Sequence, residues 1–324
     1  MSTVNGREVI VLGTWLKIAT LKDEEWLEGQ SVADPVQFTA ALRRTDLHAD
    51  IFAYSGPIDV EAVVGGAKEE KDNAAVIRTS DYKAWWEALP QEARKNTRRA
   101  AKKGIEIRLV TFDDELVKGI KAIYDEAPVR QGRQFWHFGK NLDTVRNENA
   151  TYLDRCDFLG AYFEGQLVGF MKIVYVGNVA RIMQILCMNA HQDKRPMIAL
   201  ISKAAEVCHE KEMKYLIYGK FTYGRKADSS ITEFKRRLGF EQKNFPRYYI
   251  PLTWLGRISL RFGVHAGLKG ILPAWLIDKL LKIRARWLQK VGDGLEQITS
   301  VSDHDSDEMD KVGSKAVPAR IKTR

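Results

Sequence analysis

Three strand patterns joined by tight turns constrain the fold of this 324-residue chain more than any other feature. The turns are Glu164-Gly165 and Gly177-Asn178, and dipeptides of this kind supply the positive φ angles that a hairpin requires. The flanking segments are mostly apolar, which is typical of buried strands. We therefore predict consecutive antiparallel strands over residues 158–163, 166–175 and 179–188.

A cationic turn directly follows the third of these strands. It runs from His191 to Pro196, and it leads into a predicted helix over 196–211, because proline fits the first helical turn. Free backbone N–H groups and the helix dipole favour an anion at such a position. Lys194 and Arg195 are therefore candidate ligands of a donor phosphate. The alternative is a capped helix with solvated cations, since the glycines that allow close backbone approach to a pyrophosphate are missing.

The other elements are predicted from periodicity and from helix start and stop signals. Asp34-Pro35 can cap and open a helix, and Gly104 can end a basic one. Residues 65–73 are rich in glycine and charge and are interpreted as a loop. The predicted strands are 9–12, 15–19, 51–54, 105–112, 215–218 and 247–252. The predicted helices are 35–42, 81–89, 91–103, 141–154, 228–238, an interrupted one over 255–291 and one that starts at Asp113.

Positive charge is concentrated in two segments of the chain, whose formal net charge is +9. Residues 94–103 carry six cations, and a second cluster spans 279–290. From 275 onward apolar residues alternate with the cations, as in a helix that docks on a membrane surface. Both clusters suit an anionic partner such as a nucleotide-bearing carrier, RNA or a lipid headgroup. The alternatives are solvated helix faces and, for the C-terminal helix, packing on its own domain.

The composition argues against export, membrane spanning and metal binding. No window approaches the roughly 18 uninterrupted apolar residues of a spanning helix, and the first residues lack the pattern of a secretory signal. Cys156, Cys187 and Cys208 have no metal-ligand spacing. We therefore expect a cytoplasmic protein with buried, reduced thiols and no metal, in at most peripheral contact with the inner face of the membrane.

Segment 128–140 is the densest in side chains that suit a binding site, and it lies between two predicted helices. His137 could act as a general base, because its ordinary pKa lies near neutrality. The alternative is aromatic packing that anchors the loop, with His137 as a structural hydrogen-bond donor. Four further side chains could bind an acceptor by bidentate contacts or stacking: Arg130, Arg133, Trp136 and Lys140.

A second group of candidates follows the predicted strand 215–218, at an end of the sheet where ligands collect. Tyr218 or Tyr223 could protonate a leaving thiolate or hold a carbonyl, and the alternative is a packing role with satisfied hydroxyls. Lys220 and Lys235 are candidate donor ligands. Lys235 lies on the next helix, where it is either an exposed cation or a side chain that reaches into the site.

Two motifs carry a resemblance to the FemAB-like branch of the GNAT superfamily of N-acyltransferases. Trp86-x-x-Leu89-Pro90-x-x-x-Arg94-x-x-x-Arg98-Arg99-Ala100-x-x-x-Gly104 is similar to the basic segment that joins the two GNAT-like halves of that branch. Phe234-Lys235-x-x-Leu238-Gly239-Phe240 is similar to its closing helix-turn-strand motif. The resemblance covers residues 80–252. The GNAT phosphate signature is Arg/Gln-x-x-Gly-x-Gly/Ala. Residues 194–199 occupy its place in this chain, but their sequence departs from it.

The resemblance implies an α+β fold with a GNAT-like mixed, mainly antiparallel sheet flanked by helices. It implies a reduced N-terminal half over 1–80 and an acyltransferase domain over 81–254. The residue pattern itself predicts a basic amphipathic helical extension over 255–297, and the Ser-, Asp- and Lys-rich composition predicts a disordered tail over 298–324. The implied activity is N-acyl transfer from acyl-CoA or aminoacyl-tRNA to the amine of a small molecule or peptide. A second hypothesis is a non-catalytic adaptor that binds RNA or an anionic membrane through its basic helices.

Overall fold

The computed structural model of the chain describes residues 1–22, 24, 32, 34–58, 65–130, 132–223 and 229–266. The chain divides into two compact units, Met1–Arg257 and Ile258–Arg324. The described strands are β1 (Ser2–Val4), β2 (Arg7–Leu12), β3 (Ile18–Leu21), β4 (Ile51–Ser55), β5 (Lys68–Arg78), β6 (Glu106–Val110), β7 (Val129–Arg130), β8 (Arg133–Gln134), β9 (Cys156–Phe163), β10 (Gln166–Val176), β11 (Val179–Cys187), β12 (Tyr215–Ile217) and β13 (Glu241–Pro251). The described helices are α1 (Pro35–Leu42), α2 (Tyr82–Ala88), α3 (Gln91–Lys102), α4 (Asp114–Tyr124), α5 (Leu142–Asn149), α6 (Pro196–Glu210), α7 (Ser230–Arg237) and α8 (Trp254–Arg261).

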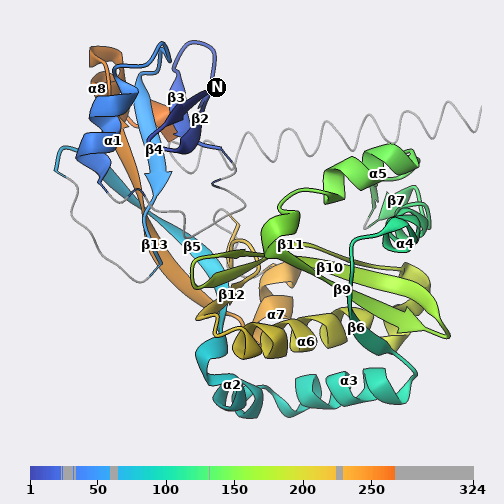
Figure 1. Ribbon diagram of the computed structural model, residues 1–324. Helices are drawn as coiled ribbons and strands as arrows, with labels where there is room; N and C mark the ends of the chain where they lie inside the picture. Colours follow the sequence, from blue (N-terminus) through green and yellow to red (C-terminus); the bar gives the residue numbers. More distant parts are fainter. Residues whose placement is uncertain are drawn as a thin grey trace, which may run out of the picture. The chain divides into compact units, whose positions relative to one another are not determined.

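The described strands form one 11-stranded sheet and a separate hairpin of β7 and β8. The order in the large sheet is β1-β2-β3-β4-β13-β5-β12-β11-β10-β9-β6 (Figure 1). Neighbouring strands are antiparallel except in two pairs, β3 with β4 and β11 with β12. The predicted α+β class with a mixed, mainly antiparallel sheet is therefore confirmed. The predicted tail and the predicted extension beyond residue 266 lie outside the described residues.

The hairpins that the turn dipeptides predict are present as β9, β10 and β11. Glu164, Gly165 and Gly177 all have positive φ, as the tight turns require. A bulge between Lys172 and Ile173 interrupts the pairing of β10 with β11. Because both faces of this part of the sheet are covered, β10 is buried along most of its length.

Helices cover both faces of the β9–β12 region (Figure 1). On one face α6 packs against β9, β10 and β11, and α3 packs on the outside of α6. On the other face α4 packs against β10, and α5 packs on α4. The helix α6 forms at its predicted position because Pro196 suits its first turn and an apolar stripe faces the sheet. Its fully buried residues are Leu200, Ala204, Ala205 and Cys208.

The N-terminal strands and α1 enclose a second core around Phe38, Phe52 and Tyr248. Asp34 caps α1 as predicted, since its Oδ1 accepts from Gln37 N–H at 2.9 Å. The strand β13 pairs with both β4 and β5, so one sheet runs through residues on both sides of position 80. The expected division into residues 1–80 and 81–254 stays a prediction.

Three boundary predictions are wrong for identifiable reasons. The expected loop 65–73 is largely strand β5, because its charged first half pairs with the sequence-distant strand β13 while its side chains stay partly exposed. For the same reason β13 begins at Glu241, six residues before the start of the strand that was predicted over 247–252. The helix expected over 141–154 ends at Asn149. There the buried Lys172 Nζ donates hydrogen bonds to the carbonyl oxygens of Asn149 and Thr151, at 2.7 and 2.5 Å.

Candidate active site

The candidate site lies where the two parallel strands β11 and β12 separate. β11 and β12 pair only over residues 179–181 and 215–217. Beyond Ile217 the chain follows β5 instead, because Tyr218 N–H donates to Ala75 O at 2.9 Å and Ala75 N–H donates to Gly219 O at 2.8 Å. β11 continues along β10 to Cys187. The two strands therefore diverge toward the carboxyl end of β11.

A pocket of about 610 Å³ lies at this end of β11. It is bounded by the last residues of β11, the turn and first residues of α6, one residue of α7 and the loop that follows α4. Its walls mix aromatic, aliphatic and cationic side chains, and none of the described lining residues carries a carboxylate. The lining residues are Arg130, Phe135, Trp136, Leu186, Cys187, Asn189, Gln192, Arg195, Pro196, Met197, Ile198 and Phe234.

The start of α6 forms one wall of the pocket. Arg195 occupies the N-cap position with a φ of 62°, and no side-chain cap hydrogen bond is present at this helix start within the described part of the chain. Residues 195–198 line the pocket, so a guanidinium and the positive end of a 15-residue helix adjoin the same space. The other predicted cation lies elsewhere: Lys194 Nζ pairs with Asp193 Oδ1 at 3.3 Å and lies over the Phe163 ring. Only Arg195 of the predicted pair therefore lines the pocket.

Arg130 lines the pocket, and its guanidinium forms hydrogen bonds with other groups of the pocket wall. Its Nη1 donates to Cys187 O at 2.9 Å, and its Nη2 donates to Glu126 Oε2 at 2.9 Å. Glu126 in turn accepts from the amides of Asn189 and Ala190 at 2.7 and 2.8 Å. The pair thus connects the end of α4 to the end of β11 and the turn that follows. Its geometry indicates a structural use of Arg130 in addition to any contact with a ligand.

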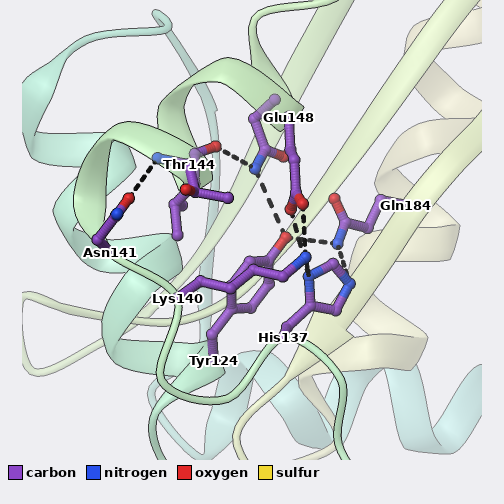
Figure 2. Close-up of polar contacts among 9 residues, drawn as sticks. Tyr124, His137, Lys140, Asn141, Thr144, Glu148 and Gln184 are labelled. Atoms are coloured by element: carbon purple, nitrogen blue, oxygen red, sulfur yellow. Dashed lines mark hydrogen bonds and ion pairs between the residues drawn. The ribbon is translucent and has the colours of Figure 1, made fainter.

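A buried polar cluster lies behind the aromatic wall of the loop 128–140 (Figure 2). His137 is 8% exposed, and its ring stacks on that of Tyr124 with centroids 4.1 Å apart. Its Nδ1 lies 3.4 Å from Lys140 Nζ and 3.6 Å from Glu148 Oε2, and Lys140 donates to Glu148 Oε1 at 2.5 Å. Gln184 of β11 donates to the Tyr124 hydroxyl at 2.6 Å. The cluster joins α4, α5, the loop and β11.

Burial is the main cause that lowers the pKa of His137 to about 4; the charge of Lys140 lowers it further, and the charge and hydrogen bond of Glu148 act in the opposite direction. The imidazole is therefore neutral at pH 7 and can accept a proton or a hydrogen bond. The neighbouring Trp136 is exposed, lines the pocket and lies under Lys140 Nζ at 3.6 Å from its ring centroid. His137, Trp136 and Lys140 thus lie next to one another, but of these three only Trp136 is among the described residues that line the pocket. Arg133 is exposed on β8 and does not line the pocket either.

The candidates after β12 form a separate group. Lys235 is fully buried, so its interpretation as an exposed cation is wrong. Its Nζ donates to the carbonyl oxygens of Tyr218 and Lys220 at 2.7 and 2.6 Å, and burial lowers its pKa to about 8. Burial raises the pKa of Tyr218 to about 12, which keeps its hydroxyl protonated. Lys220 pairs with Asp72 at 2.7 Å, and Tyr223 is half exposed.

Two further residues of the site, Glu126 and Gln184, have local signals in the sequence. Glu126 precedes Arg130 by four positions, the spacing of an ion pair near a helix end. Gln184 is a polar residue inside a mostly apolar strand pattern. Among the described residues, no group of three or more His, Cys, Asp or Glu side chains could hold a metal ion. None of the helices in the same residues is both long and apolar enough to span a membrane.

Comparisons with known proteins identify the fold. No protein-family model matches the sequence, and no curated protein matches it either. Among solved structures, the C-terminal DUF2156 domain of a protein assigned as a lysylphosphatidylglycerol synthetase from Agrobacterium fabrum superposes with a TM-score of 0.53 at 11% identity, over 80% of this chain and 86% of that one.

Two further structures give the same result. L-PGS from Bacillus licheniformis has a TM-score of 0.52 at 13% identity, with 80% of this chain and 86% of that chain covered. FemX has a TM-score of 0.52 at 10% identity, with 74% and 83% covered. The chain therefore has the fold that these three structures share, which confirms the fold expected from the two motifs.

Proposed function

We propose that the protein is an N-acyltransferase that moves an acyl or aminoacyl group from an activated ester or thioester to an amine. The observation that carries this proposal is the 610 Å³ pocket at the diverging end of β11, with Arg195 and the start of α6 in its wall. An anionic donor suits that wall because the helix dipole and the guanidinium act in the same direction. One of the structural neighbours is named for the synthesis of lysylphosphatidylglycerol, an aminoacyl ester, which supports the class of reaction.

In this proposal the amine nitrogen bonds to the donor carbonyl carbon, and the bond from that carbon to the leaving oxygen or sulfur breaks. The neutral imidazole of His137 accepts the proton that the amine loses, directly or through a water, and Glu148 stabilises the resulting charge. The leaving oxygen or sulfur departs with the bonding electron pair and takes a proton from water, because neither Tyr218 nor Tyr223 is among the described residues that line the pocket. Positioning in the pocket supplies much of the rate, so a covalent intermediate is not required.

The donor is proposed to be acyl-CoA or aminoacyl-tRNA, since both carry phosphates that Arg195 could bind. The amides of Asn189 and Ala190 are already bonded to Glu126. A donor phosphate would therefore be held from the α6 side of the pocket, by Arg195 and the first amides of α6. Arg130 and Trp136 would then face the acceptor.

Donor binding can be tested with a pair of adjacent cations. Arg195→Gln removes the guanidinium that lines the pocket, and Lys194→Gln removes a neighbouring charge that is paired with Asp193. Calorimetric titration with a CoA thioester and with an aminoacyl-RNA analogue should show affinity falling by about tenfold or more for Arg195→Gln, the value of one charge-assisted hydrogen bond. Lys194→Gln should change it far less. Equal effects of the two substitutions would contradict the assignment.

A specific observation favours a second candidate, a non-catalytic adaptor that binds RNA. α3 exposes Lys95, Arg98, Arg99 and Lys102, whose spacing places them on one helix face. Affinity for RNA should then fall steeply with salt, and His137→Gln should leave it unchanged. Turnover of an acylated donor that is lost in His137→Gln would decide for the enzyme.

A further inference from the structure

The large sheet ends in two edge strands that differ in how well they are protected from pairing with another chain. β1 is three residues long, and a short edge strand is a poor template for a further strand. β6, at the opposite edge, pairs with β9 at five consecutive positions without a register shift, and it contains no proline. Within the described part of the chain, the outer side of β6 therefore presents regular strand backbone with no strand beside it.

The side chains of β6 are exposed on both faces of the strand. Leu109 is an apolar side chain that is 59% exposed. Glu106 and Arg108 share the other face, because alternate residues of a strand point to the same side. The Arg108 Nη2 atom lies 2.5 Å from Glu106 Oε2, and both side chains are more than half exposed. The edge thus carries one anion and one cation, two positions apart on one face, and a large apolar side chain on the other.

The two charges of β6 complement those of a second copy of the same strand. Side chains directly opposite each other in an antiparallel pair interact, and opposite charges there stabilise the pairing. If two copies pair about a two-fold axis at Ile107, Glu106 of each copy lies opposite Arg108 of the other. An axis at Arg108 would instead place two guanidinium groups opposite each other, and an axis at Leu109 would place Arg108 opposite Val110. Of these three registers only the first pairs both charges, and it pairs them twice because a two-fold axis makes every contact reciprocal.

We propose that two copies of the chain pair antiparallel through β6, about a two-fold axis at Ile107, so that their sheets join. The outward N–H and C=O groups of each β6 strand then bond to the other copy. Leu109 comes to lie opposite Ile105 of the second copy, which covers an apolar side chain that is exposed in the single chain. Because each copy contributes one five-residue strand, we expect a weak dimer whose population rises with protein concentration. The proposal is independent of the reaction at the β11 pocket.

Sedimentation velocity of the full chain over a range of concentrations tests the proposal. The unmodified protein should show a reversible equilibrium between monomer and dimer. Arg108→Glu and Glu106→Arg each place like charges opposite each other at two positions, so each should raise the dissociation constant of the dimer by about tenfold or more. The exchanged variant, Glu106→Arg with Arg108→Glu, restores opposite charges at both positions and should dimerise as the unmodified protein does.

Glu8→Arg is the matched control. It changes the net charge as much as Glu106→Arg does and also removes an exposed ion pair, with Lys22 at 2.7 Å, but it lies on β2, which has a neighbouring strand on each side. It should dimerise as the unmodified protein does. The proposal is overturned if the unmodified chain stays monomeric over the whole concentration range, or if the exchanged variant dimerises no better than the two single variants. A dimer that none of these substitutions weakens would also overturn it and place the interface on another surface.

Discussion

The pKa of His137 predicts a specific loss of stability in mild acid. Burial, assisted by Lys140, lowers this pKa from 6.5 to about 4 in the folded protein. A group whose pKa is depressed by folding contributes stability above its unfolded-state pKa and loses it as the pH falls toward the folded-state value. The window for His137 therefore lies between pH 6.5 and about 4.

The expected size of the effect follows from the two pKa values. One pKa unit corresponds to about 1.36 kcal/mol. At pH 5 the unfolded histidine is almost fully protonated and the folded one is not, so lowering the pH from 7.5 to 5 should cost about 2 kcal/mol through this group alone. His137→Gln removes the titrating group while keeping a side chain that can hydrogen bond with Gln184.

Urea unfolding followed by circular dichroism at the two pH values measures this difference. The unmodified protein should lose about 2 kcal/mol more than His137→Gln on acidification. His48→Gln, which removes an exposed imidazole, should behave as the unmodified protein does. Parallel losses in the unmodified protein and in His137→Gln would refute the reasoning, as would an NMR titration in which the His137 ring protonates near pH 6.5.

Three stability predictions follow from single contacts, all measured by urea or thermal unfolding. Asn141→Ala removes the cap of α5 and should cost about 1 kcal/mol; no loss would show that the cap is dispensable. Gly239→Ala should cost clearly more than Gly165→Ala: both have positive φ, but only at Gly239 would a Cβ lie 2.7 Å from the Leu89 side chain. Equal costs would argue against that contact. Glu126→Gln should cost about 1–3 kcal/mol because a charged acceptor of two amides and a guanidinium is lost.

The parts of the fold that the sequence predicts are those with local causes. The hairpins of β9, β10 and β11 depend on turn dipeptides, and α1 and α6 depend on caps and on proline in the first turn. The strand β5 was not predicted because its charged half is stabilised by pairing with β13, more than 160 residues away in the chain. Local composition does not indicate that a strand has such a distant pairing partner.

The same distinction applies to the candidate site. Segment 128–140 is recognisable from its density of cationic and aromatic residues, and the structure brings His137, Trp136 and Lys140 next to one another, with Trp136 in the lining of the pocket. The sequence does not reveal that Lys194 turns toward Asp193 while Arg195 lines the pocket, because adjacent residues at a helix start point in different directions. It also does not reveal that Lys235 is buried against two carbonyl oxygens. Both facts depend on tertiary packing.

The start of α6 differs from the start of α1 in its side chains, although the two helices hold the same place in the topology of their halves of the sheet. β1, β2, β3, α1 and β4 repeat the order of β9, β10, β11, α6 and β12, and each half contains a parallel pair three residues long. Both helices begin with proline, but Asp34 places a carboxylate on the amides of α1, whereas Arg195 places a cation at the uncapped start of α6. An anion approaching α1 would meet a fixed charge of its own sign. At α6 it would meet the opposite sign and the N–H groups of Met197 and Ile198, which receive no side-chain cap from the described residues. The same arrangement of strands and helix therefore favours an anion at the start of α6 over the start of α1, and the difference rests on one residue at each helix start.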